Sequence, residues 1–167
     1  EPLLARVFDF SAQYEVLPDR SVKLIGMTRV VNDAGGRYLG TFVHKKWASG
    51  LSSELTEWLF REQKVVELYK YTLIEKLAEL MQSIDYVGPF GIDALVYKDA
   101  GEWRLRSCVE INARLTMGRV SLELQKKTRA KAGFFQILRL SQLGGSFSTW
   151  LEEANAAIPA PTAKYGS

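Results

Sequence analysis

Residues 91–97 read GIDALVY and residues 108–118 read CVEINARLTMG, and the run KDAGE (98–102) directly follows the first stretch. In both stretches apolar side chains alternate with polar or small ones, and this period of two is that of a β-strand. Asp and Gly in the run between them are turn-forming residues. We therefore predict strands over residues 87–97 and 103–112, joined by a tight turn into an antiparallel hairpin.

One face of this hairpin is predicted to be polar. In its first strand the apolar residues Ile92, Ala94 and Val96 suit a core, which sends Asp93 to the opposite face. In its second strand every other residue is polar or small, and these residues share one face: Arg104, Arg106, Cys108, Glu110 and Asn112. The turn brings Asp93 within a few residues of Glu110, but the exact register depends on a turn geometry that the sequence leaves open.

The polar face has the chemistry of a metal and phosphate site. Asp93, Glu110 and Asn112 offer two carboxylates and an amide oxygen, which are the hard ligands that Mg²⁺ or Mn²⁺ prefers. Arg114 lies two positions beyond Asn112, and its guanidinium could bridge phosphate oxygens on the same side. Such a set would neutralise the charge that develops in phosphoryl transfer. The alternative is a solvated sheet face with no ligand.

The remaining sequence predicts an α+β fold. Strands over residues 7–16, 22–31 and 37–43 with short turns form an antiparallel three-strand meander. Apolar residues then recur every three or four positions up to Ile84, which indicates a long helix or a broken pair that Ser52 or Ser53 caps. Further helical character runs from Gly118 to about Lys131 and over residues 147–157. The sheet, made of the meander and the C-terminal hairpin, is expected to pack against these helices.

The stretch GIDALVY…CVEINARLTMG resembles the nucleotide-site hairpin of the ATP-grasp superfamily. The resemblance implies that Asp93, Glu110 and Asn112 hold Mg²⁺ or Mn²⁺ and that Arg114 is catalytic, stabilising the transferring phosphoryl group. It also implies that Glu1 lies near the hinge between two lobes, where it binds the ribose of ATP. By the same resemblance, residues 1–131 form the C-terminal lobe of an ATP-grasp fold. Residues 132–167 are expected to be a helical extension with a loose tail.

The resemblance further implies a function for the full-length protein. An ATP- and magnesium-dependent ligase would phosphorylate a small-molecule carboxylate, and an amine or a thiol would attack the acylphosphate. The family's N-terminal lobe supplies lysines and a glycine-rich loop that this sequence does not contain. The chain therefore reads as a piece of a longer protein and is expected to be inactive alone. The alternative is a non-catalytic ATP-grasp-like module that binds nucleotide or another protein.

Composition narrows the range of partners. Charged residues make up 25% of the chain and hydrophobic residues 47%, as in an ordinary globular protein. The net charge of +3 comes from scattered basic residues, so no nucleic-acid partner is expected. No apolar run approaches the roughly 20 residues needed to span a bilayer. A single cysteine and no secretory signal favour the cytoplasm. The oligomeric state is left open, including a homo-oligomer.

Overall fold

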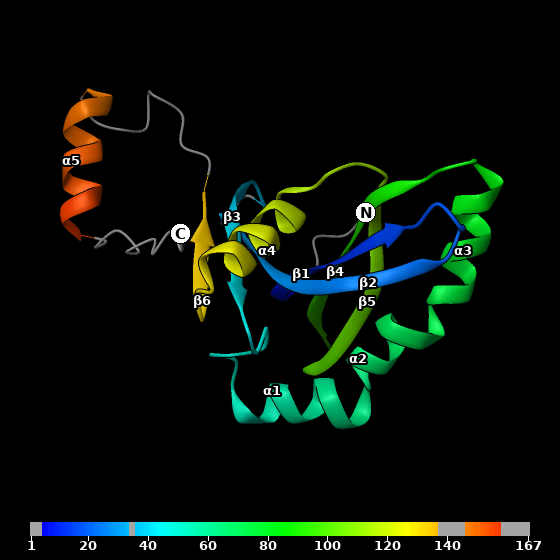
Figure 1. Cartoon of the computed structure of the whole chain (residues 1–167). Helices are drawn as coiled ribbons and strands as arrows, with labels where there is room; N and C mark the ends of the chain where they lie inside the picture. The colour runs from blue at the N-terminus through cyan, green and yellow to red at the C-terminus, as the bar shows by residue number, and fades with distance from the viewer. Residues whose placement is uncertain (1–4, 34–35, 137–145, 158–167) are drawn as a thin grey trace.

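The computed structural model describes residues 5–33, 36–136 and 146–157. Within these residues the strands form one six-stranded antiparallel sheet in the order β5-β4-β1-β2-β3-β6 (Figure 1). The strands are β1 (Ala5–Val16), β2 (Val22–Asn32), β3 (Tyr38–His44), β4 (Gly88–Asp99), β5 (Glu102–Asn112) and β6 (Ala132–Phe135). Glu1, predicted to bind ribose, and the tail beyond residue 157 lie outside the described residues.

The predicted strands are confirmed. The meander is β1, β2 and β3, with β1 paired to β2 and β2 to β3. The C-terminal hairpin is β4 and β5, and it joins the meander because β4 pairs with β1 rather than with β3. The α+β fold with an antiparallel sheet is therefore correct. Strand β6 was not predicted: its four residues follow the helix over residues 117–128, pair with β3 and extend the sheet. The proposed boundary after residue 131 stays a prediction.

The long helix between the meander and the hairpin is broken. It consists of α1 (Ser53–Glu57), η1 (Trp58–Glu62), α2 (Val65–Glu67), η2 (Leu68–Thr72) and α3 (Ile74–Ser83), where η1 and η2 are π-helical. Ser52 caps α1, since its hydroxyl accepts a hydrogen bond from the Leu55 amide (3.2 Å). These segments run in succession along one side of the sheet (Figure 1).

The core lies between this helical layer and one face of the sheet. Alternate residues of β1 and β4 are buried in one cluster with Leu59 and Met81 of the helices. Among them Phe10, Tyr14 and Phe90 are at most 1% exposed. The intervening β1 residues, among them Ser11 and Gln13, point to the opposite face. Helix α4 (Met117–Thr128) covers part of that second face, where it contacts β2, β3 and β6. The last helix is α5 (Phe147–Ala157).

The sheet therefore has one closed face and one partly open face, and the polar residues of the hairpin lie on the open one. Among the described residues, no helix is both long enough and apolar enough to cross a bilayer. The cytoplasmic location stays a prediction.

Candidate functional site

The pairing of β4 with β5 sets the geometry of the site. Asp93 lies directly opposite Glu110, whereas Leu95 lies opposite Arg106. Between these two pairs, three residues of β5 (107–109) face the single residue Ala94 of β4, so β5 carries a bulge of two extra residues. Because two residues restore the alternation of faces, the polar face continues through the bulge. The two carboxylates of the predicted metal set are thus brought face to face.

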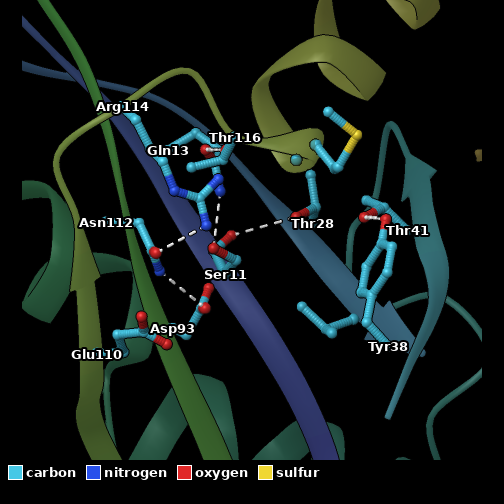
Figure 2. Close-up of a pocket in the computed structure, with 13 residues that line it drawn as sticks. Ser11, Gln13, Thr28, Tyr38, Thr41, Asp93, Glu110, Asn112, Arg114 and Thr116 are labelled. Atoms are coloured by element: carbon cyan, nitrogen blue, oxygen red, sulfur yellow. Dashed lines mark hydrogen bonds between the residues drawn. The ribbon is translucent and has the colours of Figure 1, made fainter. Parts of the chain in front are cut away.

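Asn112 links the predicted metal set to the predicted catalytic arginine. Its Nδ2 donates to Oδ2 of Asp93 (3.2 Å), and its Oδ1 accepts from Nη2 of Arg114 (3.0 Å). Figure 2 shows Asp93 and Glu110 side by side below Asn112, with Arg114 above it. Asn112 is 9% exposed, whereas Glu110 and Arg114 are exposed to solvent. The buried amide therefore holds a carboxylate and a guanidinium in one hydrogen-bonded row.

The carboxyl of Asp93 is held in an unfavourable setting for its charge. Burial raises its pKa above the ordinary value of 3.8, and the carboxylate of Glu110 adds to the rise, whereas polar contacts and the charge of Arg114 act in the opposite direction. A divalent cation between the two carboxylates would remove this penalty. Burial also raises the pKa of the Cys108 thiol, and Asp93 adds to it, which argues against a nucleophilic role for this cysteine.

A cavity of about 270 Å³ extends from this row across β1, β2 and β3 to the start of α4. Asp93, Glu110, Asn112 and Arg114 line one end of it. The rest of its wall is formed largely by neutral hydrogen-bonding side chains: Ser11, Gln13, Thr28, Tyr38, Thr41 and Thr116 (Figure 2). The cavity thus joins a charged end to a polar, uncharged wall.

The neutral wall is internally bonded. Gln13 Nε2 donates to the hydroxyl of Ser11 (2.7 Å), and Gln13 Oε1 accepts from the hydroxyl of Thr116. Thr116 also caps α4, because its hydroxyl accepts from the amide of Arg119 (3.2 Å). The guanidinium of Arg119 in turn pairs with Glu15 of β1 at 2.6 Å. The start of α4 is therefore fixed to β1 beside the cavity.

A second cavity of about 290 Å³ adjoins the first and shares Val30, Tyr38, Asp93 and Glu110 with it. Asp9 lies at its far side, where its Oδ2 accepts from Asn32 (2.6 Å) and from Arg6 (3.3 Å). Its Oδ1 is buried without a hydrogen-bond partner among the described residues. The two cavities make a continuous groove along the open face, with the two facing carboxylates at its middle.

The structure brings four of the five predicted site residues together: Asp93, Glu110, Asn112 and Arg114. Among the described residues no group of three His, Cys, Asp or Glu side chains could hold a metal ion. The donor set is two carboxylates and one amide, which fits Mg²⁺ if phosphates and water complete the shell. Sequence reasoning did not identify Ser11, Gln13, Thr28, Tyr38 or Thr41 as part of the site. Alternation along β1 could have identified Ser11 and Gln13, because it places them on the face that does not point into the core.

No protein-family profile and no curated protein matches the chain. Among solved structures, the biotin carboxylase domain of a single-chain bacterial carboxylase is similar, with a TM-score of 0.47 and 20% identity over 74% of this chain and 24% of that one. Rhizobium etli pyruvate carboxylase T882A has a TM-score of 0.45 and 15% identity, over 74% of this chain and 10% of that one. Staphylococcus aureus N5-carboxyaminoimidazole synthetase complexed with ADP has a TM-score of 0.41 and 14% identity, over 71% of this chain and 25% of that one.

The chain therefore spans a quarter or less of the length of these three proteins. All three identities lie below 25% and all three TM-scores below 0.5, so these likenesses carry no argument about family, reaction or substrate. The order of elements in this chain is a strand meander, then helices, then a hairpin in the same sheet. This is the order predicted for the C-terminal lobe of an ATP-grasp protein.

Proposed function

We propose that this chain forms the part of an ATP-grasp ligase that holds Mg²⁺ and the phosphates of ATP. In the full-length protein, a carboxylate substrate would accept the γ-phosphoryl group of ATP, and an amine or a thiol would attack the resulting acylphosphate. The observation that carries the proposal is the hydrogen-bonded row from Asp93 through Asn112 to Arg114, with Glu110 opposite Asp93, at the end of a cavity.

Each residue of the row has a separate role. The carboxylates of Asp93 and Glu110, with Oδ1 of Asn112, would hold Mg²⁺, which supplies charge neutralisation for the phosphates when it is bound. Without a metal, Arg114 donates to the same Oδ1. Its exposed guanidinium is free to turn to a phosphate or acylphosphate oxygen, which would release Oδ1 for the metal. Arg114 thus acts as the phosphate-side partner of the metal ligands.

The proposal is tested by magnesium-dependent ATP hydrolysis by the full-length protein, screened against pools of carboxylates and amines. Glu110→Ala should abolish carboxylate-stimulated phosphate release with little loss of thermal stability, because the side chain is exposed. Glu102→Ala is the matched control, since Glu102 is an exposed glutamate of the same strand that does not line either cavity of the groove. A large drop in melting temperature for Glu110→Ala alone would assign that residue a structural role instead.

The alternative is a non-catalytic module that binds nucleotide or another protein. Nucleotide binding without turnover across broad substrate pools would favour it, and the absence of both would leave only the interaction module. The ribose contact of Glu1 and the cytoplasmic location belong to the same proposal. They are tested by Glu1→Ala in the nucleotide-binding measurement and by cell fractionation.

A further inference from the structure

A buried tyrosine of the helical layer reaches through the core to the bulge in β5. Tyr69 belongs to η2 and is 0% exposed. Its hydroxyl donates to the carbonyl oxygen of Ser107 at 2.6 Å, and Ser107 is the first of the three bulge residues that face Ala94. Burial raises the pKa of the Tyr69 phenol, so the hydroxyl stays a donor at any physiological pH. A side chain that packs on the closed face of the sheet thus holds the backbone of β5, whose open face carries the candidate site.

The π-helical turn explains why Tyr69 is firmly placed. In a regular α-helix the amide of Leu73 would bond to the carbonyl of Tyr69, but here it bonds to the carbonyl of Leu68 (2.9 Å). The carbonyl of Tyr69 instead accepts from the hydroxyl of Tyr14 in β1 (2.8 Å). The ring also packs edge-on against Phe10, with centroids 5.5 Å apart. Tyr69 is therefore fixed at its backbone and its ring, and its hydroxyl is directed at β5.

The bulge decides which residue faces Asp93. From Asp99 to Leu95 the pairing of β4 follows one register, in which Leu95 faces Arg106. Continued without the bulge, that register would set Cys108 opposite Asp93. The two extra residues bring Glu110 there instead. A bulge leaves its extra residues outside the regular ladder, so this segment needs support from elsewhere.

We propose that Tyr69 is a positioning residue for the metal site: by holding the carbonyl of Ser107 it stabilises the bulge that sets Glu110 opposite Asp93. The inference rests on the proposed function, because it concerns the same metal ligands. Tyr69 is fully buried in the helical layer and does not line the groove, yet the inference assigns it an effect on metal affinity.

The test compares two one-atom changes in the full-length protein. Tyr69→Phe and Tyr86→Phe each remove one part-buried hydrogen bond from a phenol to a backbone carbonyl, but only the first of these bonds reaches β5. Binding of Mn²⁺ in the presence of ADP, measured by the electron paramagnetic resonance signal of free Mn²⁺, should weaken roughly tenfold in Tyr69→Phe, as for lost support of a metal ligand. Tyr86→Phe should lower the melting temperature by a similar amount and leave Mn²⁺ affinity within about twofold.

Equal affinities in the two variants would overturn the inference, because the hydroxyl would then serve stability only. If the unchanged protein binds no Mn²⁺ with ADP, the proposed function itself fails, and this outcome is distinct from the first. Deletion of residues 107–108 gives a second test that retains Tyr69. Arg106 then stays opposite Leu95, and Glu110 stays opposite Asp93. Val109 alone faces Ala94 between these two pairs, so a regular ladder replaces the bulge.

The deletion variant should bind Mn²⁺ with ADP as the unchanged protein does, and adding Tyr69→Phe to it should produce no further loss. A folded deletion variant that has lost Mn²⁺ binding would contradict the inference, because the bulge would then contribute to metal binding by something other than setting Glu110 opposite Asp93. The same roughly tenfold loss from Tyr69→Phe in the deletion background would contradict it as well.

Discussion

Substitution of Gly118 by alanine should destabilise the protein although it improves helix propensity. Gly118 is the second residue of α4. A Cβ at this position would lie 2.6 Å from Nε2 and 2.9 Å from Cδ of Gln13, and 3.0 Å from the hydroxyl oxygen of Thr28. Gln13 is 1% exposed and bonded to Ser11 and Thr116, so its side chain can move away from the new methyl group only into the cavity that it lines. It must therefore leave its place between Ser11 and Thr116.

The two opposing effects can be compared. Displacing Gln13 breaks its hydrogen bonds to Ser11 and Thr116, at about 1 kcal/mol each, with a further cost if the freed groups stay buried without partners. Alanine in place of glycine in a helix contributes up to about 1 kcal/mol in the favourable direction. The net result should be a loss of about 1–2 kcal/mol in the free energy of unfolding.

Urea unfolding of a double-mutant cycle measures this balance. In the Gln13→Ala background the colliding side chain is gone, so Gly118→Ala should be neutral or stabilising there. The reasoning is refuted if Gly118→Ala stabilises the unchanged protein, or if its effect is the same in both backgrounds. Either result would mean that the helix start moves away from β1 without disturbing Gln13.

Three further outcomes are expected. Asp93→Asn should abolish Mn²⁺ binding yet raise stability at neutral pH. Burial and Glu110 raise the pKa of Asp93 in the folded state, so folding is favoured while this carboxyl is protonated. That advantage is lost as pH rises through the unfolded and then the folded pKa. A stability difference between the two proteins that does not change across this pH window, measured by urea unfolding, would contradict the assignment. Arg114→Lys should lower turnover about a hundredfold, because an ammonium cannot reproduce a two-pronged contact; near-normal kcat/KM would remove Arg114 from the catalytic set. Gly40→Ala should detach residues 132–135 from β3, since its Cβ would meet the carbonyl oxygen of Phe135 at 2.7 Å, and unchanged hydrogen exchange in that segment would refute this.

Five of the six described strands were predictable because alternation in β1 and β5 is regular and the turns contain Gly, Asp or Pro. The same alternation predicted which side of the hairpin carries Asp93 and Glu110. It could not predict that the two face each other, because the bulge inserts a pair of residues and leaves the pattern of faces unchanged. Backbone pairing of this kind is decided by contacts such as that of Tyr69 with Ser107, which are distant in sequence.

Two other features lay beyond the sequence for different physical reasons. Strand β6 has only four residues, too few for a periodic signal, and it is held by pairing with β3. The break in the helix at η2 goes with a carbonyl that finds a partner in the core, because the Tyr69 carbonyl accepts from the Tyr14 hydroxyl. Helix-type spacing of apolar residues predicts that a helix exists and which face is buried, but not where its hydrogen bonds change register.

The position of β5 gives its bulge one more consequence. Within the described residues β5 is an edge of the sheet and β4 is its only neighbour there, and a long straight edge strand invites pairing with a strand of another molecule. The bulge breaks the even spacing of exposed backbone groups midway along this edge, and Arg104 and Arg106 place charge beside it. The irregularity that aligns the two carboxylates therefore also makes this edge a poor template for aggregation.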